Sequence, residues 1–194
     1  MMNIQNKIAK NQKKHQNQKN KGGLMEYFDV YDDNRILVGK TLEKGTKLSE
    51  GENRMVVHLC LFNSKGEMLI QQRQSFKKGW PNMWDITLGG NSQAGETSKQ
   101  SVHRELLEEL GIDHDFSKIR PYLTINFDNG FDDIYFLEMD IEIDKLKLQY
   151  EEVQAAKWAT KDEILKMHEN GEFIPYHKSF LSALFELKTK RGLY

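Results

Sequence analysis

The sequence has little cysteine, little proline and no long apolar run. One cysteine, Cys60, among 194 residues excludes an internal disulfide framework and a cysteine-rich zinc site. It favours a reducing, cytoplasmic setting. No apolar segment approaches the ~20 residues of a membrane-spanning helix, and the first residues lack the apolar block of a secretory signal. We therefore expect no membrane partner and a globular protein long enough to bury a core.

The net charge of −1 is the sum of two segments of opposite sign. Residues 1–23 contain six lysines and no acidic residue, so the rest of the chain carries −7. The Asn/Gln/Lys-rich composition of residues 1–24 predicts a basic, disordered arm, or alternatively an arm that touches nucleic acid or anionic lipid. The remaining residues, 25–194, are expected to form one domain. Its acidity gives no sign of nucleic-acid binding.

The domain alternates predicted strands with predicted helices. Apolar or alternating runs predict strands at 25–31, 54–62, 68–73, 84–88, 120–127, 134–143 and 153–159. Helices are expected at 98–110, from the capping box Thr160–Glu163 to near Gly171, and at 179–190. Helices interleaved with strands indicate an α/β or α+β fold.

Three glutamates share one face of the helix predicted at 98–110. Glu105, Glu108 and Glu109 fall within an arc of about 100°. Crowded carboxylates repel one another, and a cluster of hard oxygen ligands suits Mg²⁺ or Mn²⁺, which would relieve that repulsion. A solvated acidic face is the alternative explanation for three glutamates alone.

The surrounding residues form a longer pattern. Residues 89–112 read GGNSQAGETSKQSVHRELLEELGI and fit G-x5-E-x7-R-E-U-x-E-E-x-G-U, where U is a bulky aliphatic. A chance match in a chain of this length has odds of about 1 in 10⁷. Every fixed position is filled, by Gly90, Glu96, Arg104, Glu105, Leu106, Glu108, Glu109, Gly111 and Ile112. This pattern resembles the signature of the Nudix hydrolases.

Three of these residues have structural explanations of their own. Glu96 precedes the helix start, where a carboxylate is favoured by the helix dipole. Arg104 stands four residues before Glu108 and is within reach of Glu96, so we interpret it as pinning the preceding loop onto the helix. Gly111 is placed to end the helix, and either Thr97 or Ser98 to begin it.

The resemblance implies a Nudix-type α/β/α sandwich around a mixed β-sheet. It also implies Mg²⁺- or Mn²⁺-dependent hydrolysis of a diphosphate linkage in a small-molecule substrate, a nucleoside diphosphate joined to another group X. Residue by residue, it implies metal binding by Glu105, Glu108, Glu109 and the Gly90 carbonyl, with Glu105 and Glu109 as catalytic residues. Which glutamate acts on the attacking water stays open, as does the identity of X. Homodimers are common in the family, so a homodimer is a possible state.

A second resemblance covers residues 25–176. Residues 68–73, followed by Lys77, Lys78, Pro81 and Trp84, are similar to a segment of the Nudix branch nearest isopentenyl-diphosphate isomerase. Isomerases carry a catalytic cysteine and a metal-binding histidine where this chain has Gly89 and Asn91. Both departures argue against isomerase chemistry. A non-catalytic nucleotide-binding Nudix module is a third possibility, and the retained glutamates speak against it.

Several further residues are weaker candidates. Arg73 and Lys77 are candidates for binding substrate phosphates, with ordinary surface charge as the alternative. Asp132 and Asp133 precede the strand at 134–143, where the resemblance to this branch implies an extra acidic metal ligand; a plain turn is the alternative. The acidic pair at 151–152 is a similar candidate. His58 and Cys60, in an apolar strand, are expected to be core residues.

Overall fold

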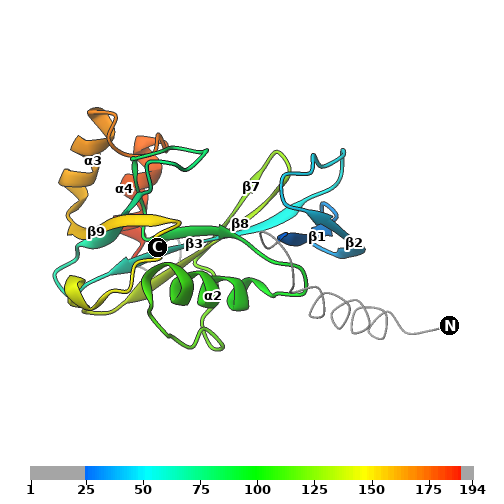
Figure 1. Ribbon diagram of the computed structural model, residues 1–194, viewed down its shortest axis with the longest axis horizontal. Helices are drawn as coiled ribbons and strands as arrows, with labels where there is room; N and C mark the ends of the chain where they lie inside the picture. Colours follow the sequence, from blue (N-terminus) through cyan, green and yellow to red (C-terminus); the bar gives the residue numbers. More distant parts are fainter. Residues whose placement is uncertain (1–24, 189–194) are drawn as a thin grey trace.

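The structure is a computed structural model that describes residues 25–188. The predicted arm at 1–24 and the end of the predicted helix at 179–190 lie outside the described residues. In chain order, the described elements are β1 (Tyr27–Tyr31), β2 (Leu37–Glu43), β3 (Arg54–Phe62), β4 (Met68–Arg73), β5 (Trp84–Asp85), β6 (Leu88–Asn91), α2 (Ser98–Leu110), β7 (Leu123–Phe127), β8 (Gly130–Glu138), a 3-10 turn (Ile143–Lys145), β9 (Val153–Ala159), α3 (Lys161–Glu169) and α4 (Lys178–Leu187) (Figure 1).

A mixed seven-stranded sheet forms the centre of the fold. Its strand order is β5-β4-β3-β8-β7, with β6 added to β3 and β9 added to β4. Strands β3 and β8 run parallel along nine residues, and the other pairs are antiparallel. Strands β3 and β4 pair only at Phe62 and Met68, beside the turn that joins them. They then diverge, so β6 pairs with β3 and β5 pairs with β4 in the opening between them.

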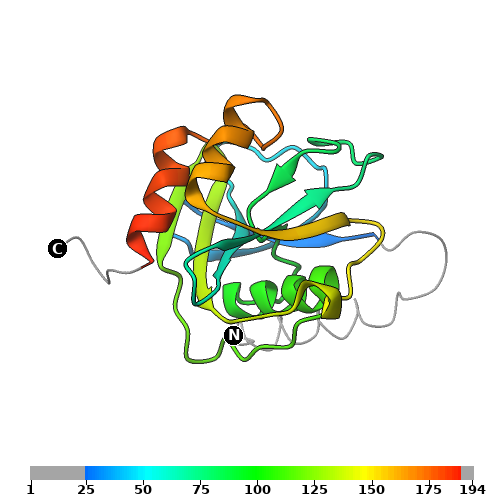
Figure 2. The ribbon, with the colours of Figure 1, turned by 90° about the vertical axis from the view of Figure 1, so that its left-hand side faces the viewer.

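Helices cover both faces of this sheet. On one face, Val102, Leu106 and Leu110 of α2 pack against a cluster that includes Val57 and Leu59. On the other face, α3 and α4 pack against a second cluster that includes Cys60, Phe62 and Ile70. Successive residues of β3 therefore contribute to opposite cores, as the two-residue period of a strand requires. Figure 2 shows the three layers edge on, which confirms the predicted α/β/α sandwich.

Two predicted strand boundaries at the hairpin of β7 and β8 are wrong. Strand β8 begins at Gly130 and ends at Glu138, whereas the sequence suggested residues 134–143. The cause is pairing that is distant in sequence: Arg54 of β3 pairs with Gly130, and the ladder ends where β3 ends, at Phe62. Asp132 and Asp133 therefore lie inside a strand and not in a turn before it.

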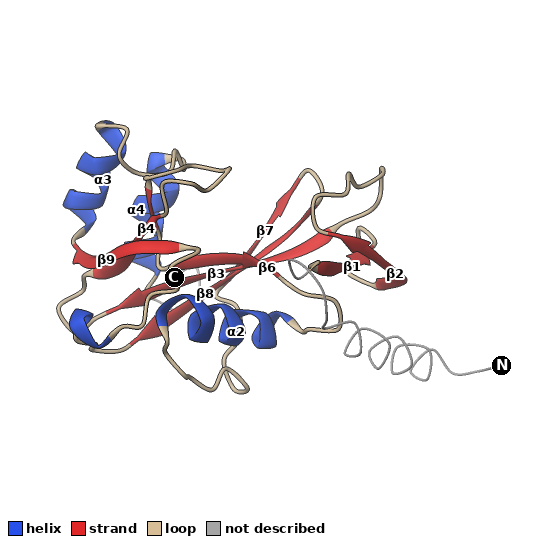
Figure 3. Cartoon of the chain, viewed as in Figure 1, coloured by secondary structure: helices blue, strands red, loops and turns tan. Residues whose placement is uncertain are grey.

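Two other strands also differ from expectation. Strand β2, which pairs with β1 in a separate two-stranded sheet, was not predicted. Its residues are mostly exposed, so it lacks the alternation of buried and exposed positions that marks a strand. The strand expected at 84–88 is divided into β5 and β6, because the chain bends at Ile86–Thr87 as it passes from β4 to β3. Figure 3 shows the two-stranded sheet beside the end of the central sheet that lies far from α3 and α4.

Within residues 25–188, no helix is long and apolar enough to cross a membrane.

Candidate active site

The helix α2 is fixed at both ends by its own sequence. Thr97 is the N-cap residue: its backbone N–H donates to Oε1 of Gln100 at 2.9 Å, and its hydroxyl accepts from the backbone N–H of Gln100 at 3.4 Å. Gly111 ends the helix in the left-handed region, with φ 71°, and a Cβ there would lie 2.7 Å from Cβ of Lys147. Because both ends are fixed, the face that carries the glutamates has a defined direction.

Arg104 connects the loop before α2 to the helix. Its Nε and Nη2 donate to the two carboxylate oxygens of Glu96 at 2.7 and 3.1 Å, and Nη2 also donates to the carbonyl oxygen of Asn91 at 3.1 Å. Burial would raise the pKa of Glu96, but the bonds and charge of Arg104 hold it below its usual value. Nη1 of Arg104 lies 2.9 Å from Oε1 of Glu105 and 3.0 Å from Oε2 of Glu108. These contacts with Glu96 and Glu108 are the ones that the spacing suggested.

Glu105 lies against the backbone of β6. A Cβ built on Gly90 would fall 2.2 Å from Oε1 of Glu105, so a side chain at position 90 would displace this carboxylate. The side chain of Glu105 is 13% exposed. Burial raises its pKa even though Arg104 lies beside it. The positive charge of Arg104 therefore does not fully offset the cost of burying the Glu105 carboxylate.

Glu109 is the most deeply buried of the three glutamates. It is 5% exposed, and burial first, followed by the charge of Glu105, raises its pKa to about 8. Its Oε2 accepts a hydrogen bond of 3.0 Å from Nε2 of Gln71 in β4, whereas Oε1 of Gln71 is buried without a hydrogen-bond partner. Sequence reasoning missed Gln71. The signal was its place two residues after Leu69 in an apolar strand, on the side that faces α2.

The residues expected to bind phosphate lie at the edge of this region. Nζ of Lys77 is 2.6 Å from Oε2 of Glu152, and the charge of Glu152 contributes to the raised pKa of Glu109. Nη1 of Arg73 lies 3.8 Å from Oδ2 of Asp85. Asp85 is buried and accepts a hydrogen bond from the hydroxyl of Tyr176 at 2.8 Å. Each predicted phosphate ligand is thus paired with a carboxylate, and neither Asp85 nor Tyr176 was a sequence candidate.

The structure separates Asp132 from Asp133. Adjacent strand residues point to opposite faces of a sheet, and here Oδ1 of Asp132 pairs with Nδ1 of His58 at 2.8 Å. Asp133 instead accepts from Arg35 at 2.9 Å and from Thr124 at 2.6 Å. Neither aspartate is bonded to a glutamate of α2.

The glutamates fit a hard divalent cation, although protein donors hold them in this structure. Among residues 25–188, no three carboxylate, imidazole or thiolate side chains form a ready metal-binding group. Arg104 contacts Glu105 and Glu108, and Gln71 contacts Glu109. The donors are all oxygens, two of the carboxylates are buried with raised pKa values, and the Gln71 oxygen has no partner. Oxygen ligands whose negative charge is not fully balanced by neighbouring cations suit Mg²⁺ or Mn²⁺.

Comparison with known proteins identifies the family. The family model described as NUDIX domain matches residues 52–180. The chain is 48% identical over 170 residues to the uncharacterized Nudix hydrolase lmo0368 of Listeria monocytogenes, an alignment that covers 88% of this chain and 99% of that protein. The family model and this relative together define a hydrolase that acts on pyrophosphate bonds. The chain belongs to the Nudix hydrolase family.

The fold is shared with a solved structure, and the likeness to isomerases is partial. The crystal structure of DR0079 from Deinococcus radiodurans matches with a TM-score of 0.67 at 24% identity, covering 81% of this chain and 98% of that one. An isopentenyl-diphosphate isomerase of Klebsiella pneumoniae is 39% identical over only 62 residues, 31% of this chain and 34% of the isomerase. The expected closeness to the isomerase branch thus has support over a short segment only.

Proposed function

We propose that this chain hydrolyses the diphosphate linkage of a nucleoside diphosphate joined to a group X. In this proposal, Glu105, Glu108, Glu109 and the Gly90 carbonyl bind Mg²⁺ or Mn²⁺. The observation that carries it is the burial of Glu105 and Glu109 together on the helix of the signature, with both pKa values raised. Buried carboxylates destabilise the fold unless a cation balances them, and such clusters are typical of functional sites.

The reaction requires charge neutralisation and an activated water. Water adds its oxygen to one phosphorus, the P–O bond of the anhydride breaks, and the leaving phosphate takes the electron pair. Glu105 or Glu109 accepts the proton that the water loses. A bound divalent cation supplies charge neutralisation on the phosphate oxygens and acidifies the attacking water.

The remaining residues bind and position. Arg73 and Lys77 leave their carboxylate partners, Asp85 and Glu152, to contact substrate phosphates. Arg104 acts as a positioning residue, because its bonds to Asn91 and Glu96 hold the end of β6, which carries Gly90, and the following loop against α2. We further infer a cytoplasmic enzyme with small-molecule substrates, in keeping with its single free and buried cysteine.

A hydrolysis screen tests the proposal. The full chain is incubated with Mg²⁺ or Mn²⁺ and a panel of nucleoside diphosphate conjugates, and released phosphate and nucleotide are measured. Glu105→Gln and Glu109→Gln should each lower the rate by about 10²- to 10⁴-fold, the usual contribution of an acid–base residue. Glu142→Gln is the matched control, because Glu142 is exposed and pairs with Lys145 at the surface.

Three outcomes would contradict the proposal. Wild-type rates in both glutamate variants, measured on a confirmed substrate, would remove these residues from catalysis. Conversion of isopentenyl diphosphate to the dimethylallyl isomer would indicate isomerase chemistry. Tight nucleotide binding without turnover across the whole panel would indicate a non-catalytic nucleotide-binding module.

A further inference from the structure

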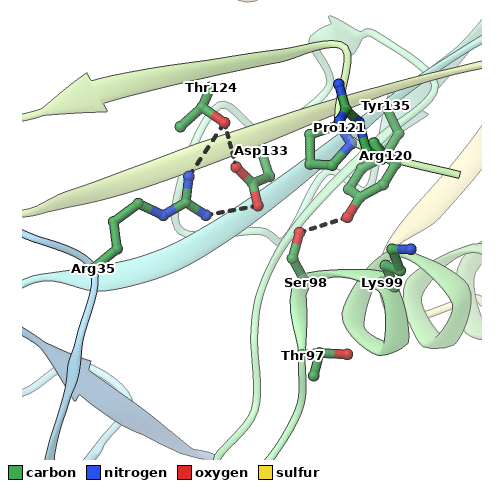
Figure 4. Close-up of a pocket in the computed structure, with 9 residues that line it drawn as sticks. All are labelled: Arg35, Thr97, Ser98, Lys99, Arg120, Pro121, Thr124, Asp133 and Tyr135. Atoms are coloured by element: carbon green, nitrogen blue, oxygen red, sulfur yellow. Dashed lines mark hydrogen bonds and ion pairs between the residues drawn. The ribbon is translucent and has the colours of Figure 1, made fainter.

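A cavity lies beside the first turn of α2 and is not lined by its glutamates. It has a volume of about 570 Å³ and sits between the first turn of α2 and the hairpin of β7 and β8 (Figure 4). Arg35, Lys99 and Arg120 line it, together with Asp133, Thr124 and several hydroxyl groups. None of the three glutamates of α2 lines this cavity, so it is separate from the candidate active site.

The cavity is positively charged in a domain that is negative as a whole. Asp133 is its one carboxylate; it is 2% exposed and pairs with Arg35 at 2.9 Å. Lys99 donates to a neutral partner, the carbonyl oxygen of Ser117, at 2.7 Å. Within residues 25–188, Arg120 takes part in none of the ion pairs. Lys99 and Arg120 thus present positive charge that no carboxylate of the cavity balances.

Arg35 is held in place before any ligand arrives. Its backbone is in the left-handed region at φ 63°, an unfavourable conformation for a non-glycine residue that recurs at functional sites. Its guanidinium lies 5.1 Å from the centre of the Phe131 ring and donates to Asp133 and Thr124. Another N–H contacts the sulfur of Met55 at 3.6 Å. Because a guanidinium has five N–H donors, two remain for a ligand.

We propose that this cavity binds a phosphorylated small molecule at a site separate from the one that hydrolyses diphosphates. Guanidinium groups and ammonium groups are the side chains that recognise phosphate. The volume of about 570 Å³ lies within the range of small-molecule sites, roughly 300–1,000 Å³, so it leaves room for an organic part beside the phosphate. The hydroxyls of Ser98 and Tyr135, which are bonded to each other at 2.7 Å, line the wall that this part would face.

Calorimetric titration without metal tests this proposal. The full chain with Glu109→Gln is titrated in EDTA with ribose 5-phosphate and, separately, with inorganic phosphate. We expect saturable binding of the sugar phosphate that is stronger than that of phosphate alone. Introducing Lys99→Met and Arg120→Met together into this chain should weaken sugar phosphate binding by about tenfold or more, since two charge-assisted contacts are lost. Lys118→Met is the matched control, because Lys118 is an exposed lysine close in sequence to Arg120 that does not line the cavity.

The possible results separate the two sites. Absence of saturable binding, or equal affinity in the Lys99 and Arg120 variant, would overturn the proposal. Loss of binding on Arg73→Met instead would place the anion in the active site and also overturn it. Thermal unfolding of each variant shows whether the fold is intact. Because neither metal nor turnover is involved, these results are independent of the proposed hydrolysis.

Discussion

The imidazole ring of His58 packs against the α-carbon of Gly89. A Cβ built on Gly89 would lie 2.4 Å from both Cδ2 and Nε2 of His58. The two residues are paired across β3 and β6. On the opposite side of β3, Asp132 of β8 bonds the ring: its Oδ1 lies 2.8 Å from Nδ1 of His58. A side chain at position 89, where the resemblance places the cysteine of an isomerase, therefore requires the ring of His58 to shift.

Gly89→Ala is expected to destabilise the fold through this contact. The added methyl group forces the ring of His58 to move, at a cost of about 1–3 kcal/mol in the free energy of unfolding. In a His58→Ala background, the same change should cost less, because the obstructing atoms are gone. Urea unfolding of the four chains gives the coupling between the two positions.

Gly79→Ala serves as the control for this cycle. A Cβ at Gly79 meets nothing within 4 Å, and its φ is not in the left-handed region. The change should alter stability by no more than about 0.5 kcal/mol. An equal cost of Gly89→Ala in both backgrounds would mean that His58 is not what constrains position 89.

The elements determined by local sequence were the predictable ones. Helix α2 runs over the predicted residues, Thr97 caps it, Gly111 ends it, and Arg104 contacts Glu96 and Glu108. These features depend on residues within about two turns of one another, where spacing alone determines which side chains meet. The α/β or α+β class followed from the alternation of helices and strands, whereas the sandwich was implied by the resemblance to the Nudix signature.

The contacts between distant segments were not predictable. Gln71 reaches Glu109 across 38 positions, and Arg35 reaches Asp133 across 98. A single sequence does not determine which strands become neighbours, so it does not show which polar residues face one another. For the same reason the start of β8 was misplaced, because its pairing with β3 extends it to Gly130.

Arg104→Met is expected to lower both stability and hydrolysis. The side chains of Arg104 and Glu96 are only 18% and 19% exposed, so removing one partner leaves a largely buried carboxylate without its charge partner. Loss of such a partner costs about 3–5 kcal/mol when the pair is fully buried, and somewhat less here. Hydrolysis should fall because the end of β6, which carries Gly90, is no longer bonded to α2 through Arg104.

Arg104→Lys distinguishes charge from geometry. Lysine keeps the positive charge but cannot bond both oxygens of Glu96 and the Asn91 carbonyl at once. We expect unfolding midpoints in urea that place this variant between wild type and Arg104→Met. A lysine variant as stable and as active as wild type would show that charge alone matters at this position.

The chain without residues 1–24 is expected to retain full hydrolysis. We propose that the functional domain begins near Met25, because the preceding segment contains six lysines and few apolar residues and the family match begins later, at residue 52. The kcat/KM of the shortened chain should stay within about twofold of the full chain, well under the effect of losing one hydrogen bond. A larger loss on the same substrate would assign the arm a role in catalysis or substrate binding.

The metal-free chain is expected to lose stability as the pH rises, because of Glu109. Burial, and then the charge of Glu105, raises the pKa of this carboxyl from 4.5 to about 8. Between these values the folded chain keeps a proton that the unfolded chain has released. The free energy of unfolding therefore falls with rising pH, by at most about 1.4 kcal/mol per unit. The contribution is complete below pH 4.5 and lost as the pH passes about 8.

Thermal unfolding in EDTA of wild type and Glu109→Gln checks this sign. The glutamine does not titrate, so the variant should gain stability relative to wild type between about pH 5 and pH 9. Glu142→Gln, at an exposed position, should follow wild type throughout. Adding Mg²⁺ should raise the Tm of wild type more than that of Glu109→Gln, because the cation favours the charged carboxylate. Parallel pH curves for wild type and Glu109→Gln would mean that Glu109 ionises alike in the folded and unfolded chains.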